Sequence, residues 1–360
     1  MRRKIIILVS IILIVAQIVN AKKTVSEDLF ATSKCLDLIA SLQYFDKLND
    51  APQFKKLVAD SVFMSNLCKV NENVSASKLC NLYITFHGGK NDTDSCQIFF
   101  MHLSKKVPES AQDSEWIKNI IELQPELSYC LAAINEAYYS EYWDSEIKPF
   151  LQGYIDSYPV SSETLDLIHS HLKDFAGSEE LSENHSNIFV MNINNAFNLS
   201  DESFCCTPLL LDKEMEKRFR LNFINVYIHE NLHRLSISEG LMNKLEELKE
   251  EDFYRENERT AARHREGLNE AFVVAAEVYI SHKMGIRDDD KVYQEFAEYV
   301  DGSLVLAPII YVNFGRRNKN ESMNDFILRL FNEGTIKTGS VKSEYEKAMA
   351  QIKLHASKSE

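Results

Sequence analysis

Two histidines and a glutamate stand close together in the chain at a spacing that suits metal chemistry. His229, Glu230 and His233 form the pattern H-E-x-x-H, and apolar residues at helical spacing surround it. The segment therefore predicts a helix that carries the two imidazoles on one face, four residues apart. Two imidazoles placed in this way can bind one Zn²⁺, each at about 2.0 to 2.1 Å from the metal. Glu230, next to the first histidine, is placed to take a proton from an attacking water.

A catalytic zinc site commonly has three protein ligands and one open position, so a third ligand is expected elsewhere. The pattern H-E-x-x-H-x-x-G-x-x-H is not completed here, because Ser236 and Glu239 occupy the positions of its glycine and last histidine. Residues 267–279 form a second apolar segment, which ends near Gly285 and predicts another helix. This second helix is the place to look for the missing ligand.

The second helix resembles that of the gluzincins, in which a glutamate completes a His-His-Glu zinc site. Its sequence is most similar to the L-N-E-G-F-A-x-x-x-E pattern of gluzincin-type aminopeptidases. Five positions match, and they are Leu268, Asn269, Glu270, Phe272 and Glu277. The resemblance implies a zincin-like fold in which Glu270 is the third metal ligand. Glu277 lies two turns further on roughly the same face, which favours a supporting or structural carboxylate over a ligand.

The chain departs from that pattern in ways that bear on activity. Ala271 and Val273 replace the glycine and the alanine, and the G-x-M-E-N motif that holds a free amino end is absent, which disfavours an aminopeptidase. Val274 stands where thermolysin-like enzymes have an aspartate that orients a ligand histidine. Glu266 is a rival third ligand, although it precedes Gly267 and lies outside the apolar helix.

A wider resemblance covers residues 35–285. The order of a helical N-terminal region, short strands, H-E-x-x-H and N-E-[AY]-x-V is similar to a family of secreted bacterial proteins catalogued only as a domain of unknown function. That resemblance implies a gluzincin-type fold and no particular substrate. It also implies a role for the β-branched stretch 186–194, because gluzincins place an edge strand just before the metal helix, where it pairs with an extended substrate.

These residues predict a zinc-dependent peptidase, with an endopeptidase favoured and a peptide or protein as substrate. The developing oxyanion needs a further donor, and the candidates are Tyr299, Tyr311, His264 and His282, among which the sequence does not decide. Two other readings stay open. One is a non-catalytic secreted binding protein that retains a zincin fold, and the other is a zinc hydrolase that acts on something other than peptides.

The elements that must position these residues are mainly helical. Glycine (11) and proline (7) are scarce among 360 residues, which argues against turn-rich all-β folds. Amphipathic helices are expected over 35–45, 54–67 and 115–155, and strands over 186–194 and 207–211. The fold class expected is therefore α+β, mainly helical, with short strands just before the metal helix.

The N-terminus has the form of a secretory signal peptide. Arg2, Arg3 and Lys4 precede an apolar stretch over 5–19, and short residues at 19–21 offer a cleavage site. Cleavage after residue 21 predicts a secreted protein without stable membrane association, and an uncleaved signal anchor is the alternative. The formal charge of -14 then becomes -17, and this acidic balance argues against a general nucleic-acid binder.

Two further features suit an exported protein. Seven cysteines suggest a disulfide framework of unknown connectivity, with at least one thiol left over. They are Cys35, Cys68, Cys80, Cys96, Cys130, Cys205 and Cys206. Five N-x-Ser/Thr sequons begin at Asn73, Asn91, Asn184, Asn198 and Asn320, and these suggest a glycoprotein.

Together these patterns divide the chain into four parts. Residues 1–21 form the signal peptide, and 22–178 form a helical N-terminal region that holds most of the cysteines. Residues 179–340 form a zincin-like metallopeptidase domain, and 341–360 form a polar C-terminal tail.

Overall fold

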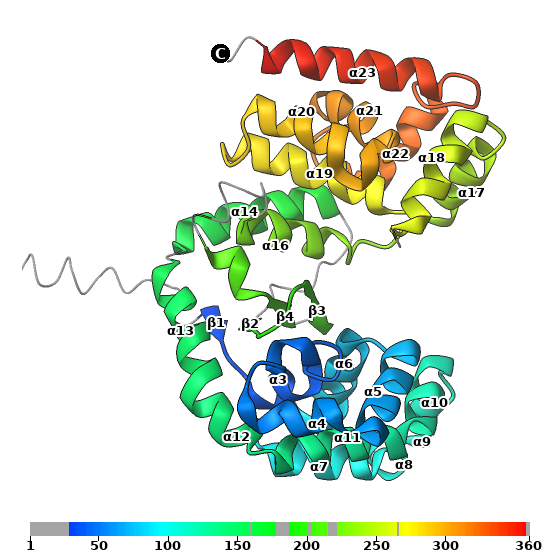
Figure 1. Ribbon diagram of the computed structural model, residues 1–360. Coiled ribbons are helices and arrows are strands. Elements are labelled where there is room, and N and C mark those ends of the chain that lie inside the picture. The colour runs from blue at the N-terminus through cyan, green and yellow to red at the C-terminus, as the bar shows by residue number, and fades with distance from the viewer. Residues whose placement is uncertain are drawn as a thin grey trace, which may run out of the picture. The chain divides into compact units, whose positions relative to one another are not determined.

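The computed structural model (Figure 1) describes residues 29–357, except 159, 178–186, 201–202, 213, 215–221 and 265. The predicted signal peptide, residues 1–21, and the sequon at Asn184 lie outside the described residues. The described chain is α+β and mainly helical, as the sequence predicts. None of its described helices combines the length and the apolar character that crossing a membrane requires.

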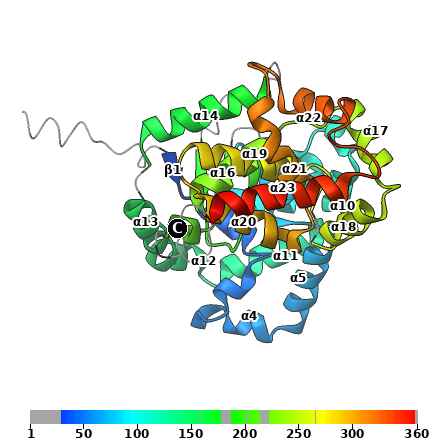
Figure 2. The same ribbon diagram turned by 90° about the horizontal axis from the view of Figure 1, so that it is seen from above.

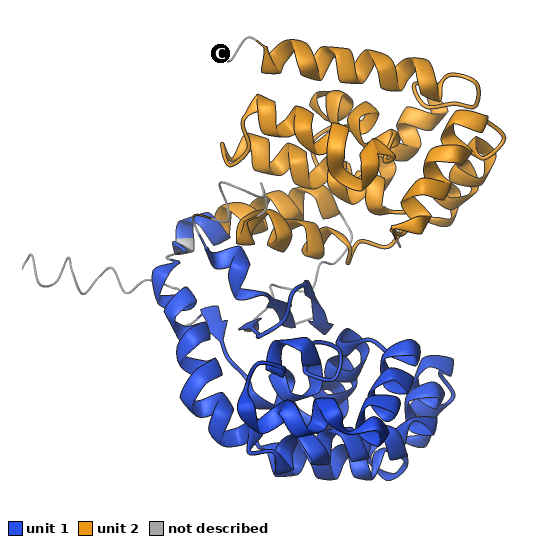
Figure 3. Ribbon diagram, viewed as in Figure 1, with its two compact units in different colours: residues 1–165, 185–213 blue, residues 166–184, 214–360 orange. Residues whose placement is uncertain are grey.

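The chain forms two compact units, coloured separately in Figure 3. The first, here called the N-terminal unit, comprises residues 1–165 and 185–213, and the second, the C-terminal unit, comprises 166–184 and 214–360. This division differs from the boundary at 178 that the sequence suggested. The strands after residue 186 belong with the N-terminal helices, because they pair with β1 (Phe30–Ala31) and pack on α6 (Ala76–His87).

Short helices separated by caps and turns build most of the N-terminal unit. The elements before its last strands are α3 (Lys34–Ala40), η1 (Phe45–Leu48), η2 (Pro52–Phe54), α4 (Lys55–Ala59), α5 (Ser61–Asn73), α6, α7 (Thr93–Met101), α8 (Leu103–Lys106), α9 (Glu109–Gln112), α10 (Glu115–Glu122), α11 (Gln124–Glu136), α12 (Tyr139–Tyr142), the π-helical η3 (Trp143–Ile147) and α13 (Lys148–Ser157).

The helices predicted over 54–67 and 115–155 are therefore interrupted. Asp60 ends one and starts the next, because its carboxylate accepts hydrogen bonds from the backbone N–H groups of Val62 and Phe63. Tyr138 takes a left-handed conformation with φ of 60°, which breaks the longer segment between α11 and α12. Apolar periodicity located the helical regions but not these local breaks.

A four-stranded sheet completes this unit, in the order β1, β2 (Asn187–Val190), β4 (Ser203–Cys206), β3 (Ala196–Ser200). The pairs β1–β2 and β2–β4 are parallel, and β3–β4 is antiparallel. The predicted strand at 186–194 is thus the internal strand β2. Because β2 has a partner on both sides, its backbone is not open to a substrate strand, contrary to the role that the resemblance implied.

Two further expectations, a strand over 207–211 and a disulfide framework, differ from the structure. Residues 207–211 do not form a strand, because Pro208 begins the 3₁₀ helix η4 (Pro208–Leu211) and the Thr207 hydroxyl accepts from the Leu209 N–H. All seven cysteines are free thiols, of which Cys68 is exposed and the other six are buried.

The C-terminal unit is built around one buried helix, α19 (Glu270–Lys283), most of whose residues are buried. The other helices are α14 (Ser162–Ala176), most of which lies in this unit, α16 (Phe223–Leu232), α17 (Glu239–Leu248), α18 (Asp252–Arg263), α20 (Asp289–Glu298), η5 (Tyr299–Gly302), α21 (Leu306–Asn313), η6 (Phe314–Arg316), α22 (Met323–Asn332) and α23 (Val341–Ala356). Helix α19 packs against α16 and α21 (Figure 2).

The segment expected as a polar tail contributes to this core. Helix α23 packs on α20 and α21 and buries Val341, Ala348, Ile352 and Ala356. Small and apolar residues at these positions form one helical face, although the segment as a whole is polar. Residues 341–356 are therefore part of the fold of the C-terminal unit.

Candidate metal centre

Helix α16 carries the H-E-x-x-H pattern and is held at both ends. The Asn222 side chain caps its start by accepting a hydrogen bond from the backbone N–H of Asn225 at 2.9 Å. The helix ends at Leu232, so that His229 lies within it and His233 is the C-cap residue. The chain then turns, and Ser238 caps the start of α17.

Helix α19 presents Glu270 at its first position, following Asn269. A carboxylate at a helix N-terminus is favoured by the positive end of the helix dipole. The apolar residues from Phe272 to Ala276 are buried, and Glu270 itself is only 1% exposed. A fully buried carboxylate requires partners that offset the loss of hydration.

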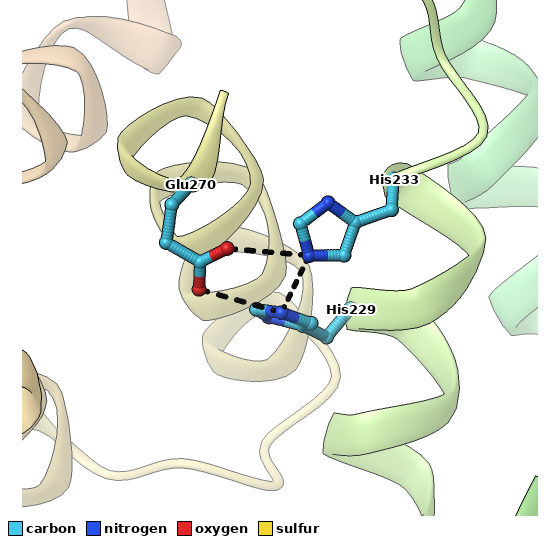
Figure 4. Close-up of side chains that lie close together, drawn as sticks. All are labelled: His229, His233 and Glu270. Carbon is cyan, nitrogen blue, oxygen red and sulfur yellow. Dashed lines mark hydrogen bonds and ion pairs between the residues drawn. The ribbon is translucent and has the colours of Figure 1, made fainter. Parts of the chain in front are cut away.

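Those partners are the two histidines of α16 (Figure 4). Oε1 of Glu270 lies 3.5 Å from Nε2 of His229, and Oε2 lies 3.2 Å from Nε2 of His233. The two imidazole Nε2 atoms are 3.0 Å apart. In a tetrahedral zinc site with bonds near 2.05 Å, two ligand atoms are about 3.3 Å apart. The three side chains are therefore spaced as metal ligands are. A search of the described residues for clustered histidine, cysteine, aspartate and glutamate side chains finds this group.

The electrostatics of the group follow from burial and from its mixed charges. Burial lowers the pKa of His229 to about 4, although the Glu270 charge opposes this. Burial also acts to lower the pKa of His233, but the hydrogen bond and charge of Glu270 outweigh it, so this pKa is raised. For Glu270, burial acts to raise the pKa, and the hydrogen bond with His233 and both imidazole charges bring it below its ordinary value. Glu270 is thus an anion, as a metal ligand must be.

Glu230 lies within the electrostatic reach of the same group. Burial raises its pKa to about 7, the His233 charge lowers it, and the Glu270 and Glu266 carboxylates raise it further. A carboxyl group with a pKa near neutrality can both accept and donate a proton at physiological pH.

Tyr299 is the candidate donor that reaches the group. Its hydroxyl donates a hydrogen bond of 3.0 Å to Oε1 of Glu270. The three residues after it have left-handed backbones, with φ of 51° at Val300, 56° at Asp301 and 68° at Gly302. This conformation is unfavourable for a β-branched valine, and a Cβ on Gly302 would lie 2.8 Å from the Ala297 carbonyl oxygen. The strained turn places Tyr299 against the ligand carboxylate.

Asn269 contacts the other side of His233. Its side-chain amide nitrogen lies 3.3 Å from Nδ1 of that imidazole. An imidazole that binds a metal through Nε2 carries its proton on Nδ1, and rotation of the amide would present Oδ1 to accept it. The residue before the carboxylate ligand can thus orient one of the histidines.

A buried polar network joins the two metal helices one turn away from the group. The side-chain amide of Asn225 donates to Oε1 of Glu277 at 2.8 Å and to the Ser281 hydroxyl at 3.1 Å. Arg287 bonds Glu277 at 3.1 Å and Glu295 at 2.7 Å, with all three side chains buried. Glu277 is therefore a structural carboxylate, and its network fixes the register of α16 against α19.

The remaining candidates lie outside the group. Glu266 is half-buried, and burial together with the Glu270 charge raises its pKa, but its carboxylate does not join the ligand atoms. Tyr311 hydrogen-bonds Nδ1 of His282 at 2.7 Å, and His264 pairs with Asp301 at 2.8 Å. The predicted third ligand, Glu270, is thus the carboxylate that the structure brings to the two histidines.

Sequence reasoning missed the Asn225 and Asn269 contacts. A signal for the first was present, because Asn225 precedes His229 by four residues and so shares its helical face. Comparison of the chain with protein-family models, with curated proteins and with solved structures finds no match in any of the three.

Proposed function

We propose that the chain is a secreted zinc-dependent metallopeptidase that cuts internal peptide bonds. The observation that carries the proposal is the grouping of two imidazoles and one buried carboxylate at nearly tetrahedral separations. Two nitrogen ligands, one oxygen ligand and an open fourth position are typical of catalytic zinc. Glu230, next to the first histidine in sequence, supports hydrolysis over simple metal storage, because binding alone does not need this carboxylate.

Each residue of the site has a distinct role in this proposal. His229, His233 and Glu270 would hold the zinc, which supplies Lewis acidity that polarises a carbonyl oxygen and acidifies water. Tyr299 holds Oε1 of Glu270 by its hydrogen bond and so limits the rotation of this ligand. Asn269 orients His233.

Glu230 carries the proton. As the water oxygen bonds to the peptide carbonyl carbon, the Glu230 carboxylate takes one water proton. It then gives that proton to the departing nitrogen as the carbon–nitrogen bond breaks.

The endopeptidase preference and the secretion rest on the sequence. The absence of a G-x-M-E-N motif disfavours recognition of a free amino end, and the first 21 residues have the form of a signal peptide. These two sequence features favour a secreted endopeptidase over other zinc hydrolases, and they do not depend on the geometry of the metal group.

The test measures metal content and turnover on the same preparations. Elemental mass spectrometry of the purified chain from residue 22 should give about one zinc per chain, and His233→Ala should lose it. Glu266→Ala, which changes a neighbouring carboxylate outside the group, is the matched control and should retain the metal.

Turnover is read from a library of synthetic peptides by mass spectrometry. Glu230→Gln should keep the zinc and lose cleavage by at least a hundredfold, since proton transfer contributes about 10² to 10⁴. Zinc retained by His233→Ala, or full cleavage by Glu230→Gln, contradicts the assignment. A zinc-loaded chain that cleaves no peptide would favour the non-catalytic binding protein.

A further inference from the structure

A cavity of about 360 Å³ lies in the C-terminal unit beside the metal group. It is here called the α18 pocket. Its walls are one face of α18, the segment 266–268, Ala271 and the segment 303–306. Sites for small ligands are typically cavities of about 300 to 1,000 Å³ with mainly apolar walls, and this cavity falls within that range.

Residues on both sides of Glu270 in the sequence line the pocket, although none of the three residues of the metal group does. Ala271 directly follows the ligand Glu270 on the first turn of α19 and forms part of the wall. Glu266, four residues before the ligand, also lines the pocket, and its carboxylate interacts electrostatically with both Glu270 and His233. The pocket therefore lies close to the metal group.

One wall of the pocket is formed by a face of α18. Tyr254, Glu258, Ala261 and Ala262 line it, and this spacing places them on one helical face. Residues 254 and 262 are about 12 Å apart along a helix axis, at 1.5 Å per residue. The opposite wall follows the left-handed turn after Tyr299, so the same turn that brings this tyrosine to Glu270 also places Leu304 at the pocket.

Its walls are mainly apolar, and three charged side chains of both signs, Glu258, Arg259 and Glu266, also line it. The two alanines of α18, Leu268, Ala271 and residues 304–306 supply aliphatic surface, and Leu268 remains 38% exposed. The Glu258 carboxylate is paired with Lys249 at 3.3 Å. The aliphatic walls therefore favour hydrocarbon.

We propose that the α18 pocket receives a large apolar side chain of the peptide substrate, one that lies next to the scissile bond. The inference rests on the proposed peptidase function and adds its substrate class. Burial of a leucine or phenylalanine side chain is worth about ten- to a hundredfold in the rate constant for cleavage relative to alanine.

The test is a substitution that fills the pocket with a larger side chain, at the exposed position Ala262. A helical side chain at this position leans back toward Glu258, so Ala262→Phe places a ring in the pocket. Glu256→Phe adds the same ring to an exposed residue of α18 that does not line the pocket, and it is the matched control.

Cleavage is compared on two pools of terminally capped random hexapeptides, one containing leucine and phenylalanine and one with alanine in their place. The wild type and Glu256→Phe should prefer the first pool at least tenfold in kcat/KM. Ala262→Phe should reduce that preference to within twofold. An unchanged preference in Ala262→Phe overturns the proposal.

A binding measurement separates the pocket from the chemistry. The zinc-loaded Glu230→Gln variant is titrated with fluorescein-labelled samples of the two pools, and tighter binding of the leucine and phenylalanine pool is expected. If that preference is present but the wild type cleaves neither pool, the peptidase function fails and the pocket stands. Cleavage or binding of both pools to the same extent leaves the peptidase function intact and overturns the pocket.

Discussion

Two carboxylates, one in each unit, are buried to almost the same extent but differ in their surroundings. Asp37 on α3 is 3% exposed, and Glu270 on α19 is 1% exposed. Asp37 accepts hydrogen bonds from neutral donors, namely the Trp143 indole N–H at 2.8 Å and the Asn192 backbone N–H at 2.7 Å. Burial outweighs these bonds and raises the pKa of Asp37 to about 7.

Glu270 has two titratable imidazoles among its partners, and that of His233 has a raised pKa. The imidazoles of His229 and His233 and the Tyr299 hydroxyl bring its pKa below the ordinary value despite comparable burial. Depth of burial therefore does not identify a metal ligand. What distinguishes the ligand is a set of partners that stabilise its charge and that a metal ion can replace.

The largest effect should come from the same isosteric change at both carboxylates. Glu270→Gln replaces an anionic ligand with a neutral amide and should leave the purified chain without zinc. Asp37→Asn makes the same replacement in the other unit and should retain about one zinc per chain. Elemental mass spectrometry measures the zinc content of both variants. Zinc loss from Asp37→Asn would contradict the conclusion that only Glu270 of these two carboxylates is a metal ligand.

Glu277 and Glu295 are buried carboxylates of a third kind, because each forms an ion pair with the Arg287 guanidinium. Arg287→Met leaves the buried Glu277 and Glu295 without their cation, which should cost about 3 to 5 kcal/mol of unfolding free energy. Arg329→Met removes the partly exposed pairs with Glu321 and Glu333 and should cost less than about 1 kcal/mol.

Urea unfolding followed by circular dichroism measures both arginine variants. Both tryptophans, Trp116 and Trp143, lie in the N-terminal unit, so their fluorescence reports that unit separately and should not change. Equal losses for Arg287→Met and Arg329→Met would show that burial of the triad contributes nothing.

Asp37 should make the stability of its unit depend on pH. Its pKa is higher in the folded chain than the ordinary value near 3.8, so the folded state binds the proton more tightly. The resulting stabilisation is fully present below about pH 4 and is lost as the pH rises through about 7. Relative to Asp37→Asn, the wild type should therefore lose a few kcal/mol of unfolding free energy over this interval.

Tryptophan fluorescence during urea unfolding at several pH values measures that difference. Asp37→Asn also turns an amide NH₂ toward one of the two donors, which lowers stability by about 1 to 3 kcal/mol at every pH. This constant loss does not affect the slope. A difference between the two proteins that stays constant from pH 4 to 7 contradicts the raised pKa.

The smallest effect concerns the hydrogen bond to the ligand carboxylate. Tyr299→Phe removes the donor to Oε1 of Glu270 and should weaken zinc binding about 10- to 100-fold. Tyr311→Phe removes a hydroxyl that bonds His282 instead and should leave zinc affinity within twofold. Competition with a chromogenic chelator measures both, and equal affinities for the two variants would remove Tyr299 from the site.

The residues of the metal group could be predicted because their spacing is local or follows a helical pattern. His229 and His233 share a turn, and the apolar pattern after Gly267 marks a buried helix, in which the resemblance to the gluzincins singled out Glu270. Their partners could not be predicted in the same way. The contact from Asn225 to Glu277 joins residues 52 positions apart, and only the packing of α16 on α19 brings them together.

The fold was predictable in class and less so in its boundaries. Apolar periodicity indicated helices correctly, but capping residues such as Asp60 divide them. A single side chain that bonds the backbone can end a helix within a segment whose apolar pattern continues. The strand expected at 207–211 is wrong because Pro208 favours a helical turn. The internal position of β2 depends on β1, a two-residue strand more than 150 positions earlier, which carries no sequence pattern of its own.

The end of α16 at Leu232 has a consequence for how the centre assembles. His229 is anchored inside a helix, whereas His233 stands on its last turn, where helices open most readily. A bound ion would tie that fraying end to the first turn of α19. Amide hydrogen exchange at residues 233–235 should therefore slow on metal binding more than exchange in the middle of α19, so that protection at this helix end reports occupancy directly.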